Sequence, residues 1–152
     1  MPIEYRTGDL FKTEIEAIAH GCNARGYMGA GIALQFKRRF PEVYKEYKTF
    51  CDGSKAYNVP ILGKHCTHYT KEKRVYSLIT QLHPGPCASI EAIETSLLGA
   101  LRLERAITEN KAELAIPRIG CGLGGLSWAK VQPVFERVAK AAEARLVVFT
   151  FT

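Results

Sequence analysis

Apolar runs rich in β-forming residues alternate along this chain with segments that have the apolar spacing of helices. Four such runs predict strands: Ile3–Arg6, Ile15–His20, Arg74–Thr80 and Leu146–Thr152. Two weaker runs are also candidate strands: His65–Tyr69 and Glu113–Ile116. The helical segments are Ala30–Phe40, Pro41–Phe50, Ser89–Glu109 and Trp128–Ala144, the last with Ser127 as its N-cap. This alternation predicts the α/β class, with a central mixed, largely parallel sheet between layers of helices.

The length and composition fit one globular domain. The chain has 152 residues, 47% of them hydrophobic and 24% charged, and no internal repeat or linker, so residues 1–152 are expected to form a single domain. No apolar run approaches the ~20 residues of a membrane span, and the start of the chain lacks the apolar stretch of a signal peptide. Five scattered cysteines indicate free thiols in a reducing cytoplasm. The net charge of +6 favours anionic partners, such as phosphates or nucleic acid.

Two glycine-rich segments, residues 21–33 and 117–126, each follow an expected strand and precede an expected helix. Neither contains Asp or Glu, and each contains one Arg. Glycine lets backbone N–H groups approach an anion, and the following helix N-terminus favours negative charge. The pair therefore predicts a phosphate or diphosphate site, although glycines that only form turns would produce the same pattern. The second segment contains Gly-x-Gly-x-x-Gly, but only 27 residues follow it, too few for a dinucleotide-binding fold.

Five motifs, in order along the chain, resemble the macrodomain family: Thr7–Leu10, His20–Asn23, Met28–Ala33, Leu78–Thr80 and Pro117–Leu123. They are most similar to the branch of terminal ADP-ribose protein glycohydrolase and the DNA ADP-ribosyl glycohydrolase antitoxins. The resemblance implies a three-layer α/β/α fold that binds ADP-ribose at the top of the sheet.

The resemblance also implies roles for individual residues. Asp9 would accept a hydrogen bond from the adenine amino group, beside the backbone of Leu10, and Asn23 would bind the distal ribose hydroxyls. Two loops would hold the diphosphate and distal ribose through Gly29, Ala30, Gly31, Ile32, Gly120, Cys121, Gly122, Leu123 and Gly124. The alternative for Asp9 is a turn residue after Gly8.

Two positions depart from the family's covalent mechanism. Gln81 stands where the terminal glycohydrolase carries a nucleophilic lysine, a position at which the DNA-directed antitoxins also depend on a lysine, and Gly124 stands where the terminal glycohydrolase carries an aspartate. The expected activity is therefore an ADP-ribosyl hydrolase that cleaves O-linked, carboxylate-type adducts with a positioned water and no metal or cofactor. Asn23 and His83 are the candidate catalytic residues. The alternatives are an ADP-ribose 1″-phosphate phosphatase and a binding module that reads ADP-ribose without catalysis.

Several further features leave two interpretations open. Trp128 either walls the cleft or packs its helix, and His20 at a strand end is expected to be structural. The residues His65–His68 have only weak metal-ligand spacing. The basic residues Lys64, Lys71, Lys73 and Arg74 form either a solvated face or a nucleic-acid contact. An ADP-ribosylated protein is the expected partner, and nucleic acid is a second.

Overall fold

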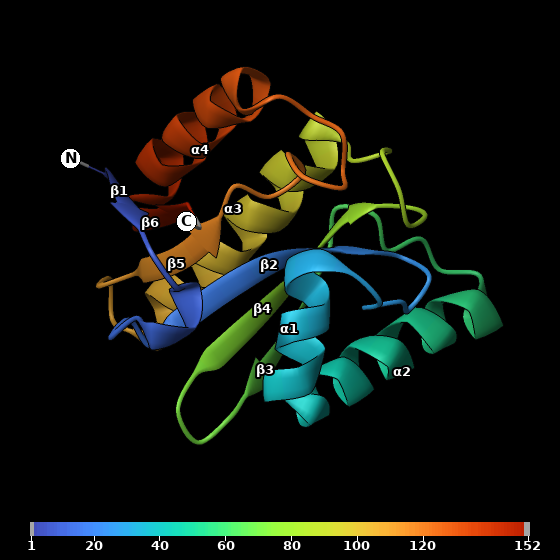
Figure 1. The fold of residues 1–152 in the computed structure, drawn as a ribbon. Coiled ribbons are helices and arrows are strands. Elements are labelled where there is room, and N and C mark those ends of the chain that lie inside the picture. Colours follow the sequence, from blue (N-terminus) through green and yellow to red (C-terminus); the bar gives the residue numbers. More distant parts are fainter. Residues whose placement is uncertain (1, 151–152) are drawn as a thin grey trace.

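The computed structural model describes residues 2–150 and contains one six-stranded sheet with helices on both sides (Figure 1). The strands are β1 (Ile3–Thr7), β2 (Ala17–Asn23), β3 (His65–Tyr69), β4 (Arg74–Gln81), β5 (Glu113–Pro117) and β6 (Arg145–Thr150). The α-helices are α1 (Gly31–Arg39), α2 (Pro41–Tyr57), α3 (Ile90–Ile107) and α4 (Trp128–Ala142). A short 3-10 helix, η1 (Leu10–Lys12), follows β1 and was not anticipated.

The strand order is β1-β6-β5-β2-β4-β3, and every pair is parallel except β3 with β4. The antiparallel pair is joined by a short connection between Tyr69 and Arg74, whereas the parallel pairs need the helical crossovers that the sequence pattern contains. The carboxyl ends of β6, β5, β2 and β4 consequently lie side by side along one edge of the sheet. Ligands of open α/β sheets bind at this edge.

Two helical layers enclose the sheet. Helices α3 and α4 pack on one face through the larger apolar core, which includes Leu97, Leu101, Val131 and Phe135. Helices α1 and α2 cover the other face through two smaller clusters, one of them around Phe36 (Figure 1). The predicted three-layer α/β/α architecture with a largely parallel sheet is confirmed.

Some boundaries differ from the expected ones. Strand β2 starts at Ala17 rather than Ile15, because the carbonyl oxygens of Thr13 and Ile15 accept hydrogen bonds from Lys73 Nζ. Helix α2 runs to Tyr57, well beyond Phe50, and ends at Asn58 in the left-handed conformation.

The remaining corrections concern helix and chain ends. Ser89 caps α3 by accepting a hydrogen bond from the Ala92 amide, so that helix begins at Ile90. Ser127 occupies the N-cap of α4 but makes no side-chain capping bond, and α4 ends at Ala142. The last two residues of the expected strand Leu146–Thr152 lie outside the described part of the chain.

Candidate functional site

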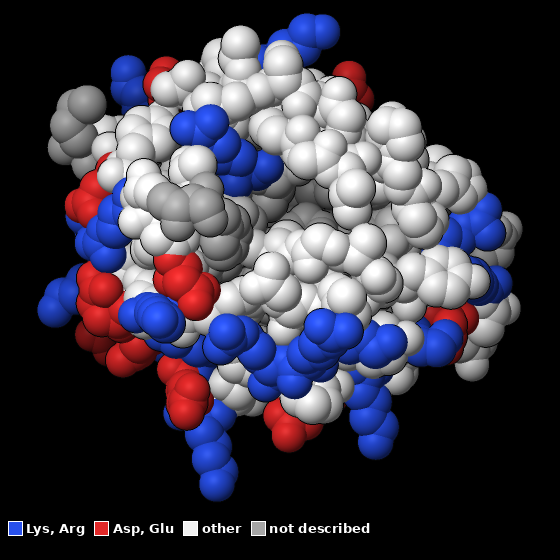
Figure 2. All heavy atoms as spheres, in the orientation of Figure 1, with Lys and Arg blue, Asp and Glu red and all other residues white. Residues whose placement is uncertain are grey.

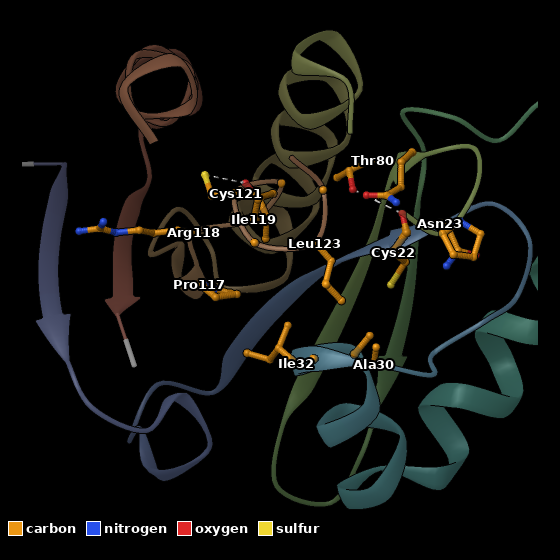
Figure 3. A pocket seen from close by; sticks show the side chains of 18 of the residues that line it. Cys22, Asn23, Ala30, Ile32, Thr80, Pro117, Arg118, Ile119, Cys121 and Leu123 are labelled. Carbon is orange, nitrogen blue, oxygen red and sulfur yellow. Dashed lines mark hydrogen bonds between the residues drawn. The ribbon is translucent and has the colours of Figure 1, made fainter. Parts of the chain in front are cut away.

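A cavity of about 650 Å³ opens at the carboxyl edge of the sheet (Figures 2 and 3). It crosses the ends of four neighbouring strands, a length of roughly 14 Å at the usual strand spacing. Its lining comes from both glycine-rich segments, the loop after β4 and the end of β6: Gly21, Cys22, Asn23, Tyr27, Gly29, Ala30, Gly31, Ile32, Ala33, Thr80, Gln81, Pro84, Gly85, Pro117, Arg118, Ile119, Gly120, Cys121, Gly122, Leu123, Gly124, Phe149 and Thr150. The volume suits a small-molecule ligand.

The two glycine-rich loops meet across this cavity. Leu123, whose side chain is 64% exposed, extends from the β5–α4 loop toward Ala30 and Ile32 at the start of α1 (Figure 3). A Cβ placed on Gly31, which has φ +58°, would lie 3.4 Å from Leu123 Cδ1. Ala30 caps α1 without any side-chain hydrogen bond, so the first-turn amides of α1 remain available to a ligand or to water.

The β5–α4 loop is wound tightly against its neighbours. A Cβ on Gly124 would lie 2.7 Å from the Gly120 carbonyl oxygen and 2.9 Å from Ala88 Cβ. The Ala88 amide also donates to the Gly124 carbonyl oxygen at 3.1 Å, and the Leu126 amide donates to the Gly120 carbonyl oxygen at 2.8 Å. No side chain fits at position 124 without movement of the loop.

The electrostatics of the cavity favour an anion. Its lining contains no Asp or Glu, and Arg118 is its one charged residue. The Arg118 guanidinium lies 5.0 Å from the centre of the Trp128 ring, a cation–π distance. The two cysteines in the lining, Cys22 and Cys121, are neutral thiols, because burial raises the pKa of each. A thiolate nucleophile is therefore absent from this lining at neutral pH.

Asn23 is placed in the lining, but its side chain mainly holds the β2–α1 loop. Its Oδ1 accepts hydrogen bonds from the amides of Arg25 and Tyr27. The Tyr47 hydroxyl shares its one proton between the Asn23 backbone oxygen, at 2.6 Å, and Oδ1, at 3.0 Å. Its Nδ2 donates to the Tyr27 carbonyl oxygen at 2.8 Å. Only one N–H of the amide is left for a ligand.

His83 lies outside the lining and is exposed. Its Nδ1 accepts a hydrogen bond from Arg25 Nε at 3.0 Å, which connects the β4–α3 loop with the β2–α1 loop. The structure therefore brings Pro84 and Gly85 to the cavity wall but not the imidazole of His83, the residue just before them.

Asp9 and Leu10 also lie outside the lining. Asp9 Oδ1 accepts a hydrogen bond from the Phe11 amide at 2.9 Å, the turn-forming role given above as its alternative. Leu10 is fully buried in the core beneath α1. Both are close in sequence to Gly8, whose amide donates to the carbonyl oxygen of Thr150 at the β6 end of the cavity.

The lining residues outside the two glycine-rich segments were not among the predicted ones: Thr80, Gln81, Pro84, Gly85, Phe149 and Thr150. The Leu78–Thr80 motif at the end of β4 was used only as evidence for the family resemblance, and no ligand contact was predicted from it. Trp128 packs edge-on against Tyr5 and Phe135 and is not a cavity wall. Within residues 2–150, no group of three His, Cys, Asp or Glu side chains is arranged to hold a metal ion.

His20 lies in β2, just before the cavity lining, and is structural as expected. It is fully buried, Nε2 lies 2.8 Å from Ser77 Oγ, and the ring stacks on Phe36 at 4.0 Å. Burial lowers the pKa of His20 from 6.5 to about 3. The folded protein therefore keeps this ring neutral at pH values where the unfolded chain protonates it.

Folding stability is expected to fall as the pH drops below 6.5, because only the unfolded state takes up the His20 proton. At pH 5 the loss amounts to about 2 kcal/mol relative to pH 7, at ~1.4 kcal/mol per pH unit. Urea unfolding of the wild type and of His20→Gln at both pH values measures it. The variant should show a smaller pH slope, and the exposed-site variant His83→Gln should keep the wild-type slope. Equal slopes in wild type and His20→Gln would contradict this assignment.

The fold and the cavity define a class, namely α/β proteins with a ligand-sized cleft at the carboxyl edge of a largely parallel sheet. The chain belongs to the Macro domain family, whose sequence profile matches residues 19–135. It is similar to DNA ADP-ribosyl glycohydrolase of Mycobacterium tuberculosis, at 34% identity over 86% of this chain and 36% of that protein. It is also similar to ADP-ribose glycohydrolase OARD1 of Homo sapiens, at 30% identity over 97% of this chain and 91% of that protein.

The solved structures agree with the sequence comparison. The macrodomain of Mycobacterium tuberculosis DarG superimposes with a TM-score of 0.83 and 32% identity, covering 97% of this chain and 96% of that one. The chain spans about a third of the length of the whole DNA ADP-ribosyl glycohydrolase. Within residues 2–150, no helix combines the length and apolar character that crossing a membrane requires.

Proposed function

We propose that this chain is an ADP-ribosyl hydrolase that releases ADP-ribose from O-linked, carboxylate-type adducts. The observation that carries the proposal is the carboxylate-free cavity, which two glycine-rich loops close over four strand ends. Such a cavity suits an elongated ligand with a doubly negative centre. The two relatives named as ADP-ribosyl glycohydrolases support the same ligand.

In the proposed binding mode the diphosphate lies at the middle of the cavity. Gly29–Ile32 and Gly120–Gly124, the latter including Cys121, Gly122 and Leu123, line the cavity there, and their free backbone amides would donate to the diphosphate. The Cys121 amide already donates to the Arg118 carbonyl oxygen at 3.3 Å, so that residue contributes as part of the wall. The adenine extends toward Asp9 and the backbone of Leu10, beyond the β6 end. The distal ribose then lies at the β4 end, where the remaining N–H of Asn23 can donate to a hydroxyl.

The chemistry of the lining limits which bonds can break. Hydrolysis at the distal ribose passes through an oxocarbenium-like state, and most glycosidases supply a carboxylic acid to protonate the leaving group. This lining offers none. A carboxylate leaving group needs no such acid, because its conjugate acid has a pKa of about 4. O-linked carboxyl adducts are therefore the substrates that a positioned water can cleave here.

The hydrolase, the phosphatase and the reader module are separated by what each releases, since the hydrolase yields free ADP-ribose, the phosphatase yields phosphate and the reader module yields neither. An acceptor protein auto-ADP-ribosylated on glutamate is incubated with a tenfold lower amount of this protein, and free ADP-ribose is followed by chromatography. Release beyond one equivalent supports the hydrolase. Saturable binding without release identifies a reader module, and phosphate release from ADP-ribose 1″-phosphate alone identifies a phosphatase.

The proposal also includes a cellular compartment, the cytoplasm, and the residues that form the domain, 1–152. The five cysteines carry no disulfide, which supports a reducing compartment such as the cytoplasm. We take residues 1–152 as one macrodomain, because both helical layers pack on a single sheet.

A nucleic-acid adduct is a second candidate substrate, and a basic band near the cavity favours it. The band consists of Lys12 in η1 and Lys37, Arg38 and Arg39 in the last turn of α1. Figure 2 shows Lys and Arg side chains in a band below the hollow, over the region where Figure 1 places α1. Among the residues that the structure describes, none of the four pairs with a carboxylate.

Two of the four basic residues noted in the sequence, Lys73 and Arg74, have a different role. Lys73 Nζ donates to two backbone carbonyl oxygens, and Arg74 pairs with Glu16 and Glu104. These two cations therefore stabilise the fold and are not free to bind a phosphate backbone.

Neutralising the band is expected to weaken binding of single-stranded DNA without affecting ADP-ribose. In the triple variant Lys37→Gln, Arg38→Gln, Arg39→Gln, the slope of log K against log salt should decrease by about 2, at ~0.7 per lost phosphate contact. Fluorescence anisotropy with a labelled 20-mer measures it. The matched control neutralises Arg102, Lys111 and Lys140, which belong to the opposite helical layer and its flank. Equal slopes in both triple variants would remove the band as a nucleic-acid surface.

A further inference from the structure

Gln81 is the last residue of β4, and it lines the cavity at the end where the proposed binding mode places the distal ribose. Its Nε2 donates to the carbonyl oxygens of His83, at 2.6 Å, and of Gly85, at 2.8 Å. Both N–H groups of the amide are therefore occupied. The opposite orientation would place Oε1 against two carbonyl oxygens, so the hydrogen bonds fix which amide atom is the oxygen.

The Gln81 Oε1 is left as an open acceptor. Among residues 2–150, no donor forms a hydrogen bond to it, and no buried side-chain oxygen or nitrogen in that range lacks a partner. Gln81 is itself only half-buried, so its unpartnered oxygen is accessible to solvent. The neighbouring amide oxygen, Oδ1 of Asn23, already accepts hydrogen bonds from two backbone amides and shares the Tyr47 hydroxyl proton with its own backbone oxygen.

Gln81 differs from the other polar side chains of the described lining because two hydrogen bonds hold it while its acceptor oxygen stays open, whereas no side-chain hydrogen bond fixes the Tyr27 hydroxyl. The cavity has no carboxylate, and Thr80 Oγ1 donates its proton to the Cys22 carbonyl oxygen. Gln81 therefore presents a neutral acceptor whose direction is set in advance by two hydrogen bonds to its own loop. A preoriented acceptor can align a water molecule without the entropic cost of ordering a mobile side chain.

We propose that Gln81 is a catalytic residue whose Oε1 accepts a hydrogen bond from the water that attacks C1″ of the distal ribose. The inference rests on the proposed hydrolase function. The water oxygen forms the bond to C1″, while the C1″–O bond breaks and its electron pair leaves with the carboxylate of the acceptor. An amide oxygen is too weakly basic to keep the proton, which passes to a diphosphate oxygen of the substrate or to bulk water.

The test separates orientation of water from support of the loop. In Gln81→Ala, kcat for release of ADP-ribose should fall about 100-fold, whereas the Kd for ADP-ribose measured by calorimetry should change less than threefold. Sodium azide, a nucleophile with no hydrogen to donate, does not need the acceptor. It should therefore restore turnover and produce ADP-ribosyl azide, detectable by mass spectrometry.

The control is Cys87→Ala, which removes another hydrogen bond to the His83 carbonyl oxygen in the same loop but changes nothing in the cavity lining. Its kcat should equal that of the wild type. Unchanged kcat in Gln81→Ala would overturn the inference, and so would a joint loss of kcat and ADP-ribose affinity that azide does not restore. Absence of turnover in the wild type would instead contradict the proposed function itself.

Discussion

A single methyl group at position 124 is expected to lower the affinity for ADP-ribose at least 100-fold, about 2.7 kcal/mol. In Gly124→Ala the new Cβ would lie 2.7 Å from the Gly120 carbonyl oxygen and 2.9 Å from Ala88 Cβ. The nearest atom belongs to the backbone, so no change of rotamer relieves the contact. The loop must move, and its amides then lose their positions around the diphosphate. Overpacking of this kind also costs about 1–3 kcal/mol of folding stability.

The matched control is Gly122→Ala in the same loop, because a Cβ on Gly122 meets nothing within 4 Å. Thermal unfolding should show a lower Tm for Gly124→Ala and an unchanged Tm for Gly122→Ala, and calorimetry gives the two affinities. Full ADP-ribose binding by Gly124→Ala would show that the loop tolerates a side chain there. The same crowding leaves no room for a larger side chain, such as that of aspartate, at this position.

Glu104→Gln is expected to lower the free energy of unfolding by about 3–5 kcal/mol, since it leaves a cation without its buried partner. Glu104 in α3 is 1% exposed and accepts hydrogen bonds from Arg74 Nε at 2.9 Å and Nη2 at 2.6 Å. It also accepts one from the Tyr76 hydroxyl at 2.7 Å. This network joins α3 to the amino end of β4, at the edge of the sheet opposite the cavity.

The chain offers a close control, because Arg74 also pairs with Glu16, whose side chain is 73% exposed. Glu16→Gln should cost less than about 1 kcal/mol, as exposed ion pairs do. Urea unfolding at pH 7 compares the two variants. A similar decrease in the free energy of unfolding for both variants would mean that burial does not make the Glu104 ion pair more stabilising than the exposed one.

Most of the fold could be predicted from local patterns. The expected strands at His65–Tyr69 and Glu113–Ile116 match β3 and nearly match β5, because both are short β-forming runs bounded by polar or turn residues. The end of α2 could not be predicted. Asp52, Gly53 and Ser54 are weak helix formers. Past them, however, Lys55 Nζ donates to the distant Arg25 carbonyl oxygen at 3.0 Å, and the Val59 amide donates to the Ser54 carbonyl oxygen at 2.9 Å behind the left-handed Asn58.

The site was only partly accessible to sequence reasoning. The two glycine-rich loops were evident, since glycines after apolar strands are a local pattern. Which side chains remain free to meet a ligand was not evident. Asn23 was expected to face a ribose, yet Tyr47, 24 residues away, occupies part of its amide oxygen. His83 was a candidate acid or base, yet Arg25, 58 residues away, holds it outside the cavity lining.

The sequence by itself determined the order of strands and helices, the two backbone-lined loops and the lack of carboxylates within them, because these depend on residues close together in the chain. Only the tertiary structure decided which polar groups of the site are hydrogen-bonded within the protein and which remain free for a ligand. That assignment depends on atoms from distant segments, such as Tyr47 beside Asn23 and Ala88 beside Gly124. It leaves the Gln81 oxygen open in the cavity lining, a state that follows from packing and not from the residue type.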